Sequence, residues 1–199
     1  LLGCYTDELE ATSTQESSFV RFYQNRVLSD DNSVSSLWID TYNQIYNLNN
    51  VLEGLEKSVG VSTDLNTQLR GEALTLRGVL HFYLAQTYGN IPYVMTTNYK
   101  INTTIGKQSV SNSIAQAIDD LTKAEQLLSD VYPSNEKVRI NKSVVEGFLA
   151  RMYLYQNNWE MAQHYAKKLI NNSTFKIEPV TTVFVKESTS AIWQLKPEV

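Results

Sequence analysis

Apolar residues recur at spacings of three and four along most of this chain, and that period restricts its fold more than any other feature. One stretch carries the period through ten positions: Leu37, Trp38, Ile39, Tyr42, Ile45, Tyr46, Leu48, Val51, Leu52 and Leu55. Such spacing places apolar side chains on one face of a helix. Apart from a loop over 89–108, only residues 1–16 and 175–199 lack a helical pattern, so the sequence predicts an all-α protein.

Helix-breaking residues divide the pattern into separate helices. Gly60 follows a first helix over about 37–58, and Ser62-Thr63-Asp64 is a capping cluster for the next. That second helix, over about 64–88, is expected to end at Gly89, because Pro92 prevents its continuation. Residues 89–108 are expected to form a long loop. Further helices are predicted over about 109–131, 142–156 and 158–171.

The last two predicted helices carry the small and large residues of a tetratricopeptide (TPR) repeat, an antiparallel helix pair. The matching positions are Leu149, Ala150, Tyr153, Trp159, Ala162, Ala166 and Leu169. Ala150 and Ala162 are expected where the two backbones approach, because a close crossing needs small side chains. Asn157-Asn158 is the expected turn, since Asn tolerates left-handed backbone geometry.

A second copy of this pattern spans the loop. Its residues are Leu84, Ala85 and Tyr88 in the first helix and Ala117, Leu121 and Ala124 in the second. We therefore expect a single domain, 1–199, of TPR-like antiparallel helix pairs stacked into a right-handed superhelix. The pairs are about 37–88, 109–131 and 142–171, with an inserted loop over 89–108 and an irregular C-terminal tail. An ordinary helical hairpin bundle is the alternative.

Charge and composition argue against several classes of function. The net charge of −4 gives no electrostatic basis for binding nucleic acid or an anionic membrane surface. No apolar stretch approaches the roughly 20 residues of a membrane-spanning helix. Cys4 is the only cysteine, which excludes an internal disulfide and a cysteine-built zinc site.

Motifs for catalysis are absent as well. The sequence holds no His-Glu-x-x-His, no Gly-x-Gly-x-x-Gly and no Gly-x-x-x-x-Gly-Lys. Of the two histidines, His81, on the helix 64–88, is expected to be a packed or capping residue, and His164 is expected to face outward. We expect a protein without enzymatic activity, metal or cofactor.

The charged residues suggest surface pairing. Asp119 and Asp120 are expected on a solvated helix face. Glu72, with Arg70 and Arg77, is expected to form an ion network on the helix surface or to tether that helix to a neighbour. Neither set has the arrangement of a catalytic carboxylate pair.

The first residues, Leu1-Leu2-Gly3-Cys4, are interpreted as the apolar end of a helix followed by a turn. The alternative is the remnant of a bacterial lipoprotein signal, in which a small residue precedes a lipidated Cys. The apolar segment of such a signal is absent from the sequence. We expect the chain to be part of a longer protein.

Three segments carry a more specific pattern. The first is Trp38-x-x-x-Tyr42-x-x-Ile45 followed by 49–52, and the third is 142–155 with Trp159-x-x-Ala162. The second runs from Gly71-Glu72-Ala73 to Tyr88-Gly89-Asn90-Ile91-Pro92. Together they resemble the SusD/RagB family of Bacteroidetes outer-membrane lipoproteins, and residues 192–195 look like the segment that follows. Gly78 stands where that family more often has Ala, and family members are commonly more than twice this long.

The resemblance implies a nutrient-binding protein on the extracellular face of the outer membrane, held there by a lipid anchor only. Its partner would be a SusC-like TonB-dependent transporter, and its ligand a glycan, bound without chemistry. A TPR-type protein–protein interaction scaffold without glycan binding is the competing hypothesis.

Sugar binding by such a protein needs aromatic faces and hydrogen-bonding side chains outside the helical core. The candidate ligand residues are Tyr5, Asp7, Tyr23, Asn25, Arg26 and Trp38. The alternative for each is a plain surface or packing role without ligand contact. The spacing of Trp38 to Tyr42 and Ile45 favours a core position for Trp38. The inserted loop, with Tyr93 and Tyr99, is a second candidate, and packing of the loop on the scaffold is its alternative.

Overall fold

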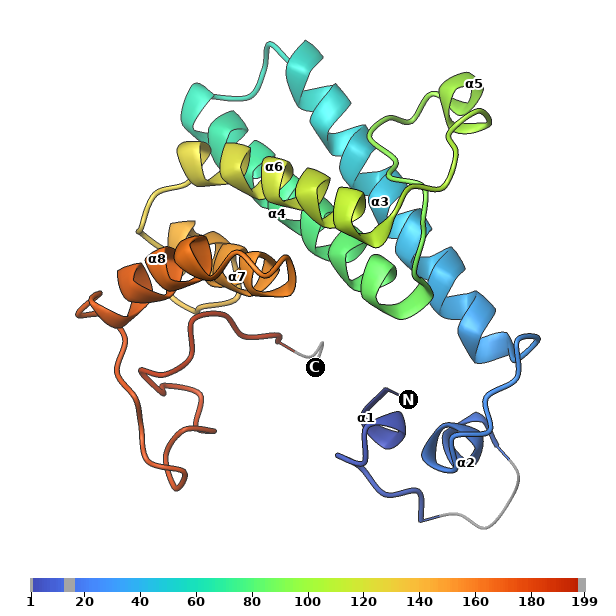
Figure 1. The fold of residues 1–199 in the computed structure, drawn as a ribbon. Coiled ribbons are helices and arrows are strands. Elements are labelled where there is room, and N and C mark those ends of the chain that lie inside the picture. Colours follow the sequence, from blue (N-terminus) through green and yellow to red (C-terminus); the bar gives the residue numbers. More distant parts are fainter. Residues whose placement is uncertain (1, 13–16, 197–199) are drawn as a thin grey trace. The chain divides into compact units, whose positions relative to one another are not determined.

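The computed structural model describes residues 2–12 and 17–196, and the regular secondary structure of this part is helical (Figure 1). Its helices are α1 (Leu2–Tyr5), α2 (Ser18–Tyr23), α3 (Asn32–Lys57), α4 (Thr63–Tyr88), α5 (Tyr99–Asn102), α6 (Val110–Leu127), α7 (Lys142–Tyr155) and α8 (Trp159–Ile170). Within the described residues, β-pairing is limited to one isolated antiparallel bridge between Ile91 and Gln108. The all-α prediction is confirmed. Parts of both segments without a helical pattern, Leu1, 13–16 and 197–199, lie outside the described residues.

Capping side chains explain where four of the longer helices begin. Ser62, Ser109, Asn141 and Asn158 each accept a hydrogen bond from a backbone N–H in the first turn of α4, α6, α7 and α8. Gly89 ends α4 with a φ of 75°, a left-handed value that suits glycine. These ends agree with the sequence pattern to within about two residues.

Two boundaries differ from prediction, and both are set by side chains. α3 begins at Asn32, five residues earlier than expected, where the Asp31 carboxylate accepts the Ser33 N–H at 2.9 Å. α6 ends at Leu127, four residues early, because Leu128 takes an extended conformation and its side chain is buried at Gly71 of α4. The predicted loop also contains one short helix, α5.

Contacts divide the chain into two compact units, Leu1–Gln44 and Ile45–Val199, and α3 contributes to both. The expected single domain therefore stays a prediction. Within the second unit, α4 lies along α6, α6 contacts α7, and α7 lies along α8 (Figure 1). The α4–α6 contact joins the two helices of the second predicted repeat across the inserted loop.

Glycines allow α4 and α6 to approach closely. A Cβ on Gly78 would lie 2.5 Å from Leu121 Cδ1 and 3.0 Å from the Ala117 carbonyl oxygen. Ala117 and Leu121 have no exposed surface. A side chain at position 78 would thus press on α6, which favours glycine there although glycine lowers the helix propensity of α4.

The α7–α8 hairpin turns as the sequence predicts. Asn157 has a left-handed φ of 58°, and Asn158 caps α8. Tyr153 and Tyr165 stack across the pair with ring centroids 5.8 Å apart. Lys168 of α8 forms ion pairs with Glu125 of α6, at 2.7 Å, and with Glu146 of α7, at 3.2 Å. The three helices are therefore joined by both packing and charge.

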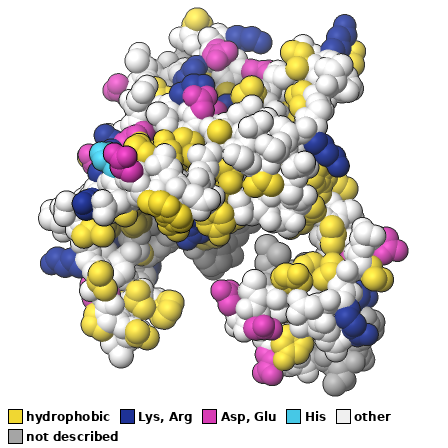
Figure 2. All heavy atoms as spheres, viewed as in Figure 1, with side chains coloured by type: hydrophobic (Ala, Val, Ile, Leu, Met, Phe, Trp, Pro, Cys, Tyr) yellow, Lys and Arg dark blue, Asp and Glu magenta, His cyan; other side chains and the backbone are white. Residues whose placement is uncertain are grey.

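The C-terminal segment after α8 is irregular, as expected. Trp193 Nε1 donates to the Val138 carbonyl at 3.0 Å, and the Tyr132 hydroxyl donates to the Ile192 carbonyl at 2.6 Å. These bonds fix residues 192–193 against the loop before α7. Farther out, Ile177, Val180 and Phe184 are exposed, and Figure 2 shows apolar side chains on this segment at lower left.

Candidate ligand-binding surface

The six residues predicted to bind ligand all belong to the unit Leu1–Gln44. They occupy three places: Tyr5 and Asp7 at the end of α1, Tyr23, Asn25 and Arg26 at the end of α2, and Trp38 in α3. Tyr5 is half exposed, and its ring meets Phe22 edge-on at 6.4 Å. The Tyr5 ring therefore contacts the buried Phe22 and remains accessible to solvent.

The end of α2 presents polar side chains on a tight turn. Asn25 has a left-handed φ of 54°, and Asp7, after α1, has one of 60°. Both side chains are exposed, as is Arg26, whose guanidinium donates a hydrogen bond to the Gln24 side chain. Tyr23 is half-buried. This turn thus combines an aromatic ring with hydrogen-bond donors and acceptors.

Asp31 organises the region around α2, and the sequence analysis did not single it out. Its buried carboxylate accepts hydrogen bonds from Arg21 Nε at 2.7 Å and from the Ser33 N–H at 2.9 Å. The Ser18 hydroxyl donates to it at 3.2 Å. The Ser33 N–H and the Arg21 guanidinium lower the pKa of Asp31 to about 2. A pattern that could have revealed this residue is its place just before a helix, where Asp is a preferred cap.

Trp38 is half-buried, so its side chain is partly in the core, where the spacing predicted it, and partly exposed. Its ring lies 4.8 Å from that of Tyr42 one turn later, at an interplanar angle of 48°. Burial raises the pKa of Tyr42. The two rings form an aromatic pair on α3 with part of the indole accessible to solvent.

The inserted loop is held to the scaffold by its polar residues. Glu53 of α3 accepts hydrogen bonds from the Thr96 hydroxyl at 2.7 Å and from the Thr97 N–H at 2.8 Å. Hydrogen bonds from Thr97 and Thr96 lower the pKa of Glu53 to about 2. Tyr93 is buried and unavailable as a stacking surface, whereas Tyr99 is 69% exposed. For Tyr93, packing of the loop on the scaffold is the observed role.

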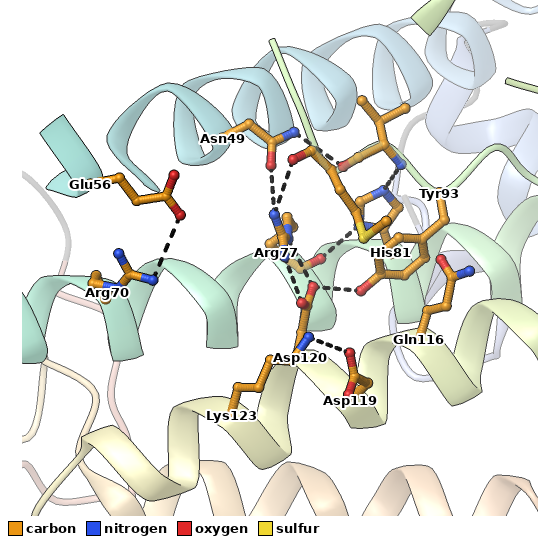
Figure 3. Close-up of polar contacts among 12 residues, drawn as sticks. Asn49, Glu56, Arg70, Arg77, His81, Tyr93, Gln116, Asp119, Asp120 and Lys123 are labelled. Carbon is orange, nitrogen blue, oxygen red and sulfur yellow. Dashed lines mark hydrogen bonds and ion pairs between the residues drawn. The ribbon is translucent and has the colours of Figure 1, made fainter. Parts of the chain in front are cut away.

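Beneath the loop, a buried polar network joins three helices (Figure 3). The Arg77 guanidinium of α4 donates to the Asp120 carboxylate of α6, Nε to Oδ2 at 2.8 Å and Nη2 to Oδ1 at 2.6 Å. Its Nη1 donates to Asn49 Oδ1 of α3 at 2.9 Å. The Tyr93 hydroxyl donates to Asp120 Oδ2 at 2.8 Å. All four side chains are buried, so both charges are compensated and hydrogen-bonded.

This network corrects two predictions. Asp120 is 1% exposed rather than solvated, while Asp119 is exposed as expected. Consecutive helical residues point about 100° apart, so Asp120 faces α4 and Asp119 does not. Arg77 likewise pairs across to α6 and not along its own helix with Glu72, which instead pairs with Arg139 at 2.8 Å. The alternative prediction, a tether from α4 to its neighbours, is confirmed.

His81 is fully buried, as predicted, and links α4 to the loop. Its Nε2 accepts the Val94 N–H at 3.0 Å, and its Nδ1 lies 2.9 Å from the Arg77 carbonyl oxygen. The ring stacks on Tyr93 at 3.8 Å between centroids. Burial lowers the pKa of His81 to about 3. The ring is therefore neutral and carries its proton on Nδ1, since Nε2 accepts a hydrogen bond.

Two properties of the described residues concern side-chain clusters that hold metal ions and helices that span membranes. In residues 2–12 and 17–196, no group of three or more His, Cys, Asp or Glu side chains is placed to hold a metal ion. Cys4 is buried. Within the same residues, no helix has both the length and the apolar character needed to cross a membrane.

Sequence comparison assigns the family. A family model described as starch-binding and associating with the outer membrane matches residues 4–154, about three-quarters of the chain. The chain belongs to the SusD-like family. A SusD-like protein of Formosa agariphila is 22% identical over 142 residues, which are 71% of this chain and 27% of that protein.

Solved SusD-like structures share the fold. One from Bacteroides fragilis superposes with a TM-score of 0.81 at 21% identity, covering 92% of this chain and 37% of that one. A laminarin-binding SusD-like protein superposes with a TM-score of 0.67 at 21% identity, covering 72% of this chain and 32% of that one. The chain thus spans about a quarter to two-fifths of the length of these SusD-like relatives.

Proposed function

We propose that this SusD-like chain is part of a cell-surface protein that binds oligosaccharides without catalysis. The family match over residues 4–154, with its description as starch-binding and associating with the outer membrane, is the observation that carries this proposal. A structurally similar protein that binds laminarin supports a glycan as the ligand class. The protein would be lipid-anchored on the extracellular face of the outer membrane and deliver its ligand to a SusC-like TonB-dependent transporter.

Within the chain, we assign ligand contact to the surface formed by Tyr5, Asp7, Tyr23, Asn25, Arg26 and Trp38. Aromatic rings stack on the C–H faces of sugar rings, and amide, carboxylate and guanidinium groups bond to sugar hydroxyls. The half-exposed ring of Tyr5 and the polar turn after α2 supply both kinds of contact. Water competes for each of them, so single contacts are weak and affinity depends on several together.

The test is a glycan-panel binding assay on the chain, with Tyr23→Ala and Trp38→Ala beside the parent. Loss of a stacked ring is expected to weaken binding by about threefold to tenfold. Tyr46→Ala is the control, because it also removes a solvent-accessible ring but lies outside the candidate surface. Circular dichroism verifies that each variant is folded. Binding that is unchanged in both variants would remove this surface from the proposal.

The competing function is a TPR-type scaffold for a protein partner. Glycan binding through rings and hydroxyls is insensitive to salt, whereas a peptide held by polar groove residues is released as salt rises. A chain that binds no glycan on the panel but captures a peptide in a salt-dependent manner would favour the scaffold. Co-purification with an outer-membrane barrel protein would test the transporter partnership.

A further inference from the structure

A groove lies in the unit Ile45–Val199, on side chains that the candidate surface does not use. The groove has a volume of about 450 Å³ and is formed by α4, α7 and the C-terminal segment. Its lining residues are Tyr83, Val144, Gly147, Phe148, Arg151, Ser190, Ala191, Ile192 and Trp193. Arg151 is the only charged residue among them.

Within residues 17–196, Arg151 differs from the other arginines of this unit because it pairs with no carboxylate. Arg70, Arg77 and Arg139 each form an ion pair with a carboxylate. The exposed guanidinium of Arg151 instead donates from Nη1 to the Tyr83 hydroxyl at 2.8 Å, and it makes no ion pair within residues 17–196. The groove therefore presents a positive charge that pairs with no carboxylate of residues 17–196 and that a tyrosine orients.

The rest of the groove is aromatic and firmly held. Phe148 and Trp193 meet edge-on at 6.2 Å, and the Trp193 Nε1–H is bonded to the Val138 carbonyl. Lys137 Nζ donates to the carbonyls of Ala191 and Ser188, at 2.7 and 3.3 Å. These bonds fix the segment that forms one wall, so the groove is shaped before a ligand arrives.

We propose that this groove binds a carboxylated saccharide, a uronic acid within an oligosaccharide chain. The guanidinium of Arg151 pairs with the uronate carboxylate, because its planar fork matches the two carboxylate oxygens. The apolar walls at Phe148 and Trp193 receive the C–H faces of the sugar ring. Tyr83 acts as a positioning residue that holds Arg151 in place. The inference rests on the proposed function, since it takes a glycan as the ligand and specifies that this glycan carries a negative charge.

The experiment is calorimetric titration of the chain with tetragalacturonate, with laminarin as the neutral glycan and oligoglutamate as a non-sugar polyanion. We expect Arg151→Gln to weaken tetragalacturonate binding by at least about tenfold, as loss of a charge-assisted contact does. Tyr83→Phe keeps the ring and removes the hydroxyl, and should weaken binding by about threefold. Arg70→Gln is the matched control for Arg151→Gln and should bind as the parent does. Arg70 lies in α4, about 20 Å along that helix from Tyr83.

Three results would overturn the proposal: no tetragalacturonate binding by the parent, equal binding by Arg151→Gln, or equal binding of oligoglutamate. Laminarin binding without tetragalacturonate binding would leave the proposed glycan function intact and remove only the groove. Absence of binding to every glycan on the panel would contradict the proposed function itself. Circular dichroism of each variant separates loss of the site from loss of the fold.

Discussion

The two compact units are stabilised over different distances along the chain. In Leu1–Gln44, the buried Asp31 carboxylate accepts from Ser18, Arg21 and Ser33, all within 13 positions of it. In Ile45–Val199, Arg77 and Asp120 are 43 positions apart and join two long helices. The candidate ligand residues all belong to the locally held unit.

This difference separates binding from scaffold stability. Contacts between distant residues form only when the helices pack, so their loss affects the whole unit. Contacts within a short segment stabilise that segment alone. Substitutions at Tyr5 or Tyr23 should therefore change ligand binding with little effect on the unfolding of the α4–α6 scaffold, and the following predictions test that separation.

The largest effect is expected from Asp120→Ala, which leaves the buried Arg77 guanidinium without its counterion. Loss of one partner of a buried ion pair costs about 3–5 kcal/mol of unfolding free energy. Asp119→Ala is the adjacent control, because Asp119 forms an exposed pair with Lys123 and should change stability by less than about 1 kcal/mol. Urea unfolding measures both, and equal losses would contradict the assigned role of the network.

Gly78→Ala comes next, because the new methyl group would lie 2.5 Å from Leu121. Overpacking of this kind costs about 1–3 kcal/mol, more than the helix propensity gained. Gly54→Ala, in α3 with open space around it, should stabilise by about 0.5–1 kcal/mol. Thermal unfolding of the two variants should give shifts of opposite sign, and a stabilising Gly78→Ala would show that α6 can move away.

A pH dependence of the scaffold is expected from His81. Its folded pKa of about 3 lies below its ordinary value of 6.5, so between these values the unfolded chain binds the extra proton. Stability therefore falls as the pH falls, by up to about 1.4 kcal/mol per pH unit. Urea unfolding between pH 6.5 and 4.5 should show this slope in the parent and a flatter one in His81→Gln. Identical slopes would exclude His81 as the cause.

The N-terminal unit should respond in a more acidic range and only locally. The lowered pKa of Asp31, about 2, means that its carboxylate stabilises the unit above its ordinary pKa near 4, and that this contribution is lost as the pH falls toward 2. The Ser33 amide resonance should shift through this range in the parent and in Asp30→Asn, but not in Asp31→Asn. A shift that survives in Asp31→Asn would assign the transition to another carboxyl group.

Helix positions were predictable because helix formation depends on neighbours in sequence. The three- and four-residue spacing, Gly89 and the Asn157 turn are local signals, and the structure follows each of them. The burial of His81 was likewise predicted from its apolar neighbours on one helix. The binding surface was predicted only as a set of residue types outside these helices, and its contact with ligand remains a prediction.

The sequence alone therefore determined the five longer helices to within a few residues, the repeat and the family resemblance. The tertiary structure decided which polar residues are buried: it separated Asp120 from Asp119 and removed Tyr93 from the surface. Among the described residues, it also gave Arg151 a tyrosine as its partner in place of a carboxylate. It also explains why glycine suits position 78, because α6 approaches α4 closely there. Each of these depends on which helix face meets a distant part of the chain, and local spacing carries no information about that partner.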